Sequence, residues 1–124
     1  MDKMPNIIFT GSKDIRNLPP YLQNMDVAII PFLLNTLTKS IYPLKINEYL
    51  AAGRAVIATN FSEDIRTFKD VIHIAESEDQ FVNLIDKAIE EQTPEKIQKC
   101  VDVANSNTWE ARVKQVWDIV ENKI

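Results

Sequence analysis

The sequence predicts an α/β fold of the doubly wound, Rossmann-like kind, with a parallel sheet of about four strands flanked by helices. Two observations lead to this prediction. Short apolar runs without alternation recur along the chain, each beside a Gly or Pro or a polar turn, and such runs are typical of strands buried on both faces of a parallel sheet. Helical patterns separate these runs, and strands that alternate with helices imply right-handed crossovers.

The four strands are expected at 6–10, 26–30, 55–59 and 71–75. The first run stops at Gly11 and the second at Pro31, while the third follows Gly53. Four strands are fewer than such sheets usually have. The sequence therefore indicates either a small domain or part of a larger one.

Six helices are expected, at 18–25, 43–52, 62–68 and 77–91, then from Thr93 and from about Thr108. Ser62, Ser77 and Thr93 precede three of them as N-caps, and Gly53 is a natural residue just past the end of another. The clearest helix, 77–91, has one apolar stripe. In the last helix the apolar side chains share one side, and we interpret its two tryptophans as core anchors: Trp109, Val113, Val116, Trp117 and Val120.

Length and composition fit a single globular domain. The chain has 124 residues and a net charge of −4, so it has no overall basic field for a nucleic acid or an anionic membrane. One Cys and one His exclude a disulfide framework, and no metal site is expected. The chain shows neither a long apolar stretch nor a signal-peptide pattern at its start. We therefore expect an intracellular, cytoplasmic protein.

Ligands of open α/β sheets bind beyond the carboxyl ends of the strands. The longest loop there, 32–42, is rich in small polar groups and leads into the helix at 43–52, whose start favours a phosphate. Lys45 and Glu48 lie on nearly the same face of that helix. They are either a solvated pair, or a phosphate-neutralising cation with a carboxylate that accepts sugar hydroxyls.

Several segments together resemble a known family. They are the Lys-x-x-Glu-Tyr-Leu-Ala-Ala-Gly segment at 45–53, the stretches at 5–11, 18–27 and 30–38, and Asn-Thr-Trp-Glu-Ala-Arg at 107–112. In this order they resemble the C-terminal, donor-binding domain of the retaining group 1 GT-B glycosyltransferases. The resemblance covers nearly the whole chain, 1–124, and implies that it is a partial nucleotide-sugar-binding domain, the second half of a GT-B donor domain.

Eight positions form the expected donor-binding set, and the resemblance assigns a role to five of them. Glu48 matches the second acid of the family's two-glutamate motif, which holds the ribose hydroxyls, while Ser40 stands where the first acid is usual and carries no charge. Tyr42 matches an aromatic position, and Leu44 lies in the turn that faces the donor. Gly11 matches the glycine that lets the first loop approach the nucleotide. Lys13, Lys45 and Thr38 complete the expected donor-binding set, whereas no catalytic residue is assigned.

The resemblance further implies an enzyme that moves a hexose from a nucleotide sugar to an acceptor hydroxyl in bacterial polysaccharide or glycoconjugate synthesis. The sugar donor is expected to be UDP-linked. No residue of the sequence shows whether the nucleoside of the donor is uridine, guanosine or adenosine. No other cofactor is expected. We expect the N-terminal acceptor domain and the first half of the donor domain to lie outside this chain. We therefore expect this fragment alone to be inactive, and we expect membrane association only through the intact enzyme.

Two other functions stay open. The chain could be a non-catalytic Rossmann-like domain that binds a protein partner, which Ser40 in place of a glutamate favours. The second is a receiver-like signalling domain. The sequence argues against this interpretation, because no acidic cluster follows the first predicted strand. His73 and Cys100 are interpreted as packing residues, His73 as a partly buried, hydrogen-bonded side chain and Cys100 as part of a helix face.

Overall fold

A computed structural model describes residues 4–124 of the chain. Its sheet has three parallel strands in the order β1 (Val27–Ile30), β2 (Ala55–Thr59) and β3 (His73–Ala75). Val27 pairs with Ala55 and Ile57 pairs with His73, which sets the register of the two ladders. The α/β class and the parallel sheet predicted from the sequence are thereby confirmed.

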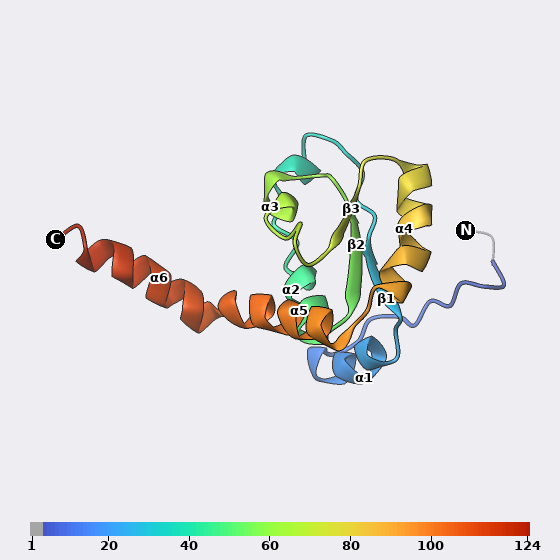
Figure 1. The fold of residues 1–124 in the computed structure, drawn as a ribbon, viewed down its shortest axis with the longest axis horizontal. Coiled ribbons are helices and arrows are strands. Elements are labelled where there is room, and N and C mark those ends of the chain that lie inside the picture. The colour runs from blue at the N-terminus through green and yellow to red at the C-terminus, as the bar shows by residue number, and fades with distance from the viewer. Residues whose placement is uncertain (1–3) are drawn as a thin grey trace.

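Helices cover both faces of this sheet, as Figure 1 shows. On one side lie α2 (Lys45–Ala51), α3 (Glu63–Arg66) and α5 (Pro94–Ser106), and on the other lies α4 (Glu78–Glu90). The chain also forms α1 (Leu18–Gln23), α6 (Trp109–Glu121) and two short 3-10 helices, η1 (Ile15–Asn17) and η2 (Thr38–Ser40). The expected helices are all present, most of them a residue or two shorter than predicted.

The helix starts follow from capping side chains that the sequence displays. The hydroxyls of Ser62, Ser77, Thr93 and Thr108 each accept a hydrogen bond from the backbone N–H three residues on. At the other end of α2, Gly53 has a φ of +67°, as expected of the residue just past a helix end. These local signals explain why the helix boundaries were predictable.

The larger core lies between the sheet and the helices α2, α3 and α5. Its largest fully buried side chains include Ile30, Ile46, Leu50, Phe61 and Ile65. A smaller cluster on the opposite face joins Ala55 and Ile57 to Ala88 of α4. Burial of each large side chain contributes about 1.5–3 kcal/mol, so this core holds α2 and its exposed face in a fixed position.

The strand predicted at 6–10 does not form, and this prediction was wrong. The segment is extended, and the side chains of Ile8 and Phe9 are 86% and 75% exposed. A strand is stable only when neighbouring strands pair its N–H and C=O groups. The apolar pattern met the local requirement for a strand, but no described strand pairs with the segment.

The interpretation of Trp109 and Trp117 as core anchors was also wrong. Their side chains are 78% and 63% exposed. Figure 1 shows the reason: α6 continues from the end of α5 and extends away from the sheet and its covering helices. The apolar face of α6 is periodic, as predicted, but the described part of the chain does not cover it.

Candidate functional site

Glu48 lies on the exposed face of α2 and is shared by two cavities. One, of about 310 Å³, lies between α1 and α2, with Leu18, Leu22 and Ala51 in its lining. The other is a groove of about 720 Å³ between α2, α3 and the junction of α5 with α6. The Glu48 carboxylate forms no hydrogen bond or ion pair with residues 4–124, so it is free to accept hydrogen bonds from a ligand.

Glu48 also affects the pKa of the neighbouring Tyr49. The pKa of Tyr49 is raised above its usual value, mainly by burial of the phenol and then by the Glu48 carboxylate. A raised pKa keeps the Tyr49 hydroxyl protonated over the whole physiological pH range. Tyr49 is therefore an uncharged neighbour of Glu48.

Lys45 stands at the start of α2, and its ammonium lies over an aromatic ring. Its Nζ atom is 5.1 Å from the centre of the Phe32 ring. Phe32 itself packs on Phe61, with 4.8 Å between the ring centres. A cation–π contact of this kind positions the ammonium at low cost. It places the positive charge of Lys45 beside the loop that follows β1.

Tyr42 and Leu44 line the groove together with Glu48. The Tyr42 hydroxyl accepts a hydrogen bond of 3.0 Å from Nδ2 of Asn47, and its ring packs 6.2 Å from that of Phe68. Leu44 is exposed at the N-terminal end of α2 and provides no side-chain cap. Tyr42 is thus held rigidly, while Leu44 presents backbone and an apolar side chain to the groove.

The loop 32–42 is held by its own side chains. The buried Thr38 hydroxyl donates to the carbonyl of Leu33, and the Thr38 N–H donates to Oδ1 of Asn35 at 2.9 Å. Thr59 of β2 donates to the carbonyl of Phe32 at 2.6 Å. Thr38 therefore lies inside the loop, with its hydroxyl engaged, whereas Ser40 ends η2 with its side chain exposed.

Gly11 and Lys13 lie in the exposed segment that precedes α1. Gly11 has a φ of +71°, and the Lys13 ammonium lies 5.6 Å from the centre of the Tyr21 ring in α1. Neither residue lines either of the two cavities that Glu48 lines. The structure thus brings Tyr42, Leu44 and Glu48 to one groove. The Lys45 ammonium lies over Phe32, and Lys45, Gly11 and Lys13 line neither cavity.

At the carboxyl ends of β2 and β3, the structure shows a chain of polar side chains that sequence reasoning missed. Nε of Arg66 donates to Oδ1 of Asn60 at 2.8 Å, and Nδ2 of Asn60 donates to the Glu76 carboxylate at 2.8 and 3.1 Å. Together with Lys39 they line a cavity of about 580 Å³. Only the position of Asn60 and Glu76 directly after two parallel strands could have indicated it.

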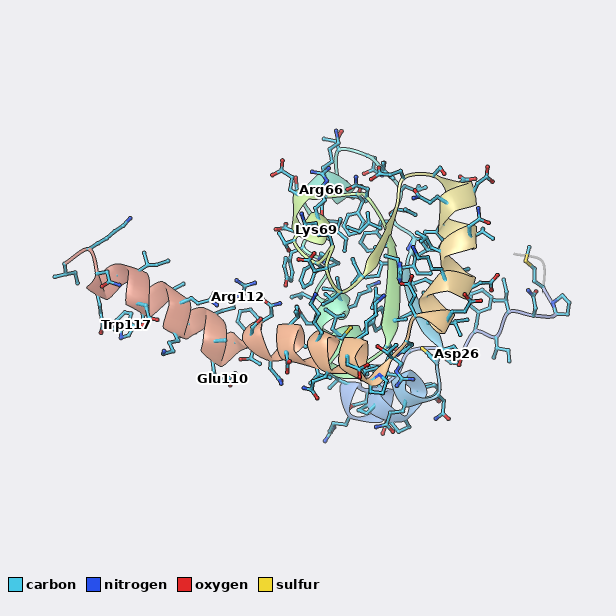
Figure 2. The ribbon with its side chains drawn as sticks, viewed as in Figure 1. Asp26, Arg66, Lys69, Glu110, Arg112 and Trp117 are labelled. Atoms are coloured by element: carbon cyan, nitrogen blue, oxygen red, sulfur yellow. The ribbon has the colours of Figure 1, made fainter. Side chains whose placement is uncertain are left out.

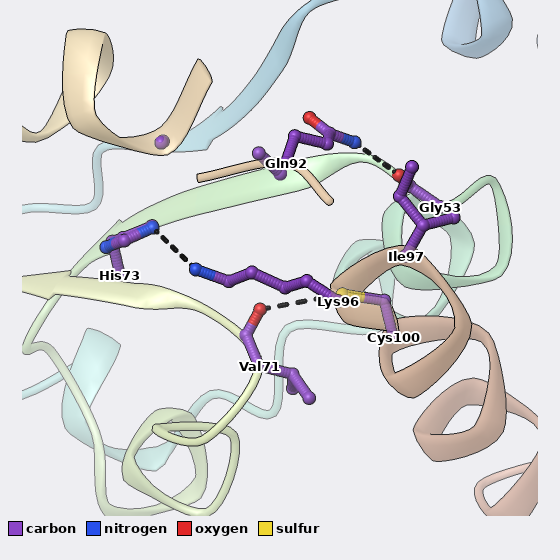
Figure 3. A pocket seen from close by; sticks show the side chains of 9 residues that line it. Gly53, Val71, His73, Gln92, Lys96, Ile97 and Cys100 are labelled. Carbon is purple, nitrogen blue, oxygen red and sulfur yellow. Dashed lines mark hydrogen bonds between the residues drawn. The ribbon is translucent and has the colours of Figure 1, made fainter. Parts of the chain in front are cut away.

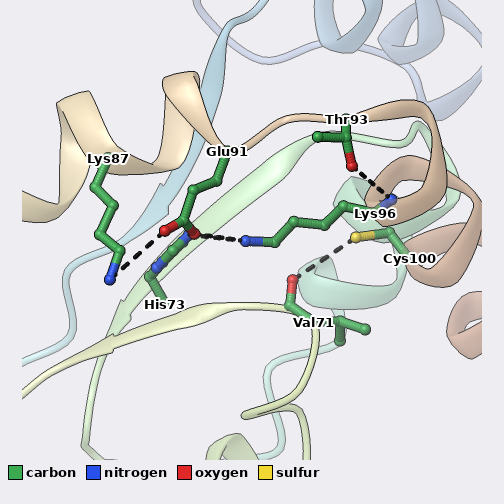
Figure 4. Close-up of polar contacts among 7 residues, drawn as sticks. All are labelled: Val71, His73, Lys87, Glu91, Thr93, Lys96 and Cys100. Atoms are coloured by element: carbon green, nitrogen blue, oxygen red, sulfur yellow. Dashed lines mark hydrogen bonds and ion pairs between the residues drawn. The ribbon is translucent and has the colours of Figure 1, made fainter.

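A second cluster of charged side chains lies at the other end of β3 (Figure 4). The Lys96 ammonium donates to Glu91 at 2.9 Å and lies 3.4 Å from Nε2 of His73, while Lys87 is 3.6 Å from Glu91. Burial, and then the charge of Lys96, lower the pKa of His73. The His73 side chain is partly buried and hydrogen-bonded, as predicted.

Cys100 lies beside this cluster (Figure 3). Its buried thiol is 3.7 Å from the carbonyl of Val71. Burial raises the pKa of the thiol, which therefore stays protonated and unreactive. The interpretation of Cys100 as a packing residue is confirmed, and the cluster as a whole ties α4 and α5 to β3.

Two searches of residues 4–124 gave negative results. No group of three or more His, Cys, Asp or Glu side chains is placed to hold a metal ion. Within the same described residues, no helix is both long enough and apolar enough to cross a membrane.

Known proteins resemble this chain over much of its length. The family model described as "Glycosyl transferases group 1" matches residues 2–91. A Bacillus subtilis (strain 168) protein described as "Putative teichuronic acid biosynthesis glycosyltransferase TuaH" is 32% identical to the chain over 71 residues. That match covers 57% of this chain and 18% of the Bacillus protein. No solved structure matches the chain.

Proposed function

Because this chain belongs to the group 1 glycosyl transferases, we propose that it binds the nucleotide part of a nucleotide sugar through Glu48. The observation that supports this proposal is the unpaired Glu48 carboxylate, exposed on α2 where two cavities meet. Glu48 lies within the segment that the family model matches. In this proposal, an acceptor domain elsewhere in the intact enzyme completes the active site.

The chemistry of the two side chains suits a nucleoside diphosphate. A carboxylate accepts hydrogen bonds only, and it can take one from each hydroxyl of a ribose. Lys45 lies one helical turn before Glu48, and its ammonium would neutralise a phosphate of the same ligand. Phe32 holds that ammonium beside the loop after β1, and in this proposal Lys45 and Glu48 contact different parts of one ligand.

In the intact enzyme, the proposed reaction transfers a hexose to an acceptor hydroxyl with retention of anomeric configuration, in polysaccharide or glycoconjugate synthesis. The negative charge that develops on the leaving nucleotide would be stabilised electrostatically, with Lys45 contributing. The Ser40 hydroxyl would contact the donor sugar as a neutral donor and acceptor. The proposal places this reaction in the cytoplasm, and it assigns no catalytic activity to the 124-residue chain alone.

The proposal is tested by titrating the wild-type chain, Glu48→Gln and Glu90→Gln with UDP, GDP and 2′-deoxy-UDP. Binding is read from the backbone amide signals of each chain. Glu90 is an equally exposed glutamate of α4, on the opposite face of the sheet, and serves as the matched control. We expect wild type and Glu90→Gln to bind UDP or GDP, with shifts around residues 38–48. We also expect the 2′-deoxy nucleotide to bind about tenfold more weakly.

Glu48→Gln should bind UDP and 2′-deoxy-UDP with equal, weak affinity, because the charged acceptor of both hydroxyls is gone. The proposal is wrong if neither UDP nor GDP shifts any signal near α2. It is also wrong if Glu48→Gln still binds UDP more tightly than 2′-deoxy-UDP. Such a result would favour the second candidate function, a protein-interaction domain. That alternative is supported by the exposed apolar side chains of Ile8, Phe9 and α6.

A further inference from the structure

The groove beside Glu48 has a second wall, which the junction of α5 and α6 provides. This wall is lined by Asn107, Trp109 and Arg112. The opposite wall has Tyr42 before α2, Glu48 on α2 and Asp64 on α3. The volume of about 720 Å³ lies within the range of small-molecule binding sites. The junction lies beyond residue 91, where the match to the family model ends.

Trp109 gives the groove a flat apolar surface. Its side chain is 78% exposed although an indole ring of this size is usually buried. The exposed ring lies among hydrogen-bond donors and acceptors. The Arg112 guanidinium donates, the carboxylates of Glu48 and Asp64 accept, and the Asn107 amide can do both. Ligands that combine an apolar C–H face with a rim of hydroxyl groups match such a surface, and saccharides are the ligands of that kind.

The polar wall is partly preorganised before any ligand arrives. Nη2 of Arg112 donates to Oδ1 of Asn107 at 2.6 Å, and Nη1 donates to Oε1 of Gln115 at 3.2 Å. These bonds fix the guanidinium near the start of α6, next to the body of the molecule, where Figure 2 shows it. Among residues 4–124, the carboxylates of Asp64 and Glu48 form no hydrogen bond or ion pair, so both remain free acceptors. A ligand would therefore meet held donors and unpaired acceptors in one groove.

We propose that this groove binds a saccharide whose sugar ring stacks on Trp109, with hydroxyl groups bonded to Asn107, Arg112 and Asp64. The choice of a saccharide rests on the proposed function, because a glycosyl transferase handles sugars on both its donor and its acceptor. The sugar belongs either to an acceptor glycan or to the donor. Both present the same chemistry to the groove, and the experiment below separates them.

The experiment follows the indole signal of Trp109, by fluorescence and by its Nε1–H resonance, in a Trp117→Phe background that leaves Trp109 as the single tryptophan. The probes are maltotriose, cellotriose and chitotriose, and UDP-glucose compared with UDP, each up to tens of millimolar. We expect at least one probe to change the Trp109 signal in a saturable way. A trisaccharide that does so identifies an acceptor site, while UDP-glucose acting where UDP does not identifies the donor sugar.

Variants show whether the groove is responsible. Trp109→Ala and Asp64→Asn should each weaken binding of the active probe about tenfold or more, measured on shifted backbone amides in an otherwise wild-type chain. Trp117→Ala is the matched control, because Trp117 is also exposed on α6 but lies farther out along the helix (Figure 2). It should leave binding unchanged. Both tryptophans are exposed, so neither truncation removes core packing.

The proposal is overturned if no trisaccharide changes the Trp109 signal and UDP-glucose changes it no more than UDP does. It is also overturned if Trp117→Ala weakens binding as much as Trp109→Ala does. Failure of the nucleotide site is recognised separately, since it is read from UDP-induced amide shifts near Glu48. A chain that binds UDP but none of the saccharides contradicts this inference alone. A chain that binds a trisaccharide but no nucleotide contradicts the proposed nucleotide site and leaves the groove assignment in place.

Discussion

Gly53 ends α2 in a conformation that only glycine adopts easily. Its φ is +67°, and a Cβ atom added there would lie 2.8 Å from Cγ2 of Ile97 in α5. The Gly53 carbonyl accepts a hydrogen bond of 2.6 Å from Gln92, as Figure 3 shows. Gly53 therefore ends α2 and leaves room for α5 to pack against α2. Its hydrogen bond with Gln92 also connects it to the end of α4.

We expect Gly53→Ala to lower the free energy of unfolding by about 1–3 kcal/mol, from the left-handed backbone and the contact with Ile97. Chemical denaturation measures this change. Gly11→Ala is the control, because Gly11 has a similar φ of +71° but no atom within 4 Å of the added Cβ. Its cost should stay below about 1 kcal/mol, since the segment around it is not packed. Equal losses in the two variants would contradict a role for Ile97.

At the scale of elements, the cluster at the start of β3 joins three of them. His73 belongs to β3, Glu91 follows α4, and Lys96 lies in α5. Burial and the ammonium of Lys96 lower the pKa of His73 from its ordinary value of 6.5, and Lys87 lowers it further, while Glu91 opposes them. The folded protein therefore binds fewer protons at His73 than the unfolded chain does.

This difference predicts how stability depends on pH. Between the lowered pKa and 6.5, the unfolded state holds more protons, so the free energy of unfolding rises with pH. The contribution of His73 is complete above pH 6.5 and is lost as the pH falls through the folded-state pKa. His73→Gln, measured by denaturation at a series of pH values, should flatten the profile in this window. His73 is the single histidine of the chain, so an unchanged profile would refute the prediction.

Glu91 acts in the same direction at lower pH. Its hydrogen bond with Lys96 lowers the pKa of its carboxyl below 4.5, so its contribution to stability is present above that value and is lost below it. The cluster thus stabilises the attachment of α4 and α5 to β3 most strongly near neutral pH. The cluster of His73, Glu91 and Lys96 lies at one end of β3, and Asn60 and Glu76 lie at the other end. The cluster joins two helices to the sheet, so its role is structural.

At the scale of the whole molecule, a packed body contrasts with two peripheral segments. The body contains the sheet, α2, α3, α4 and most of α5, whereas α6 extends away and residues 4–14 have no regular structure (Figure 1). A helix of 13 residues without a packed face is marginally stable in water. The stability of the chain is therefore distributed unevenly along it.

Amide hydrogen exchange should show this contrast directly. We expect the amides of Val56, Ile57 and Ala58 in β2 to exchange about a thousandfold or more slower than unstructured amides, since they open only with the whole core. The amides of 113–121 in α6 should exchange within about tenfold of the unstructured rate. Slow exchange throughout α6 would contradict this picture and would indicate that its apolar face is covered in solution.

Much of this molecule was predictable because the signals are local. Capping hydroxyls at Ser62, Ser77 and Thr93 determine helix starts within three residues of sequence, and Gly53 ends α2 for the same reason. The exposed position of Glu48 follows from helical periodicity once Ile46 and Leu50 are assigned to the core. The α/β class, the helices and the face of α2 that carries Glu48 could therefore be predicted from the sequence alone.

What these elements pack against depends on the tertiary fold. Residues 6–10 have the pattern of a strand, but pairing depends on a distant part of the chain, and the segment stays unpaired. The apolar stripe of α6 predicted a core contact for Trp109, yet α6 leaves the sheet at the end of α5 and turns that ring toward the groove beside Glu48. Periodicity shows which side chains share a face; what that face packs against depends on contacts between residues far apart in sequence.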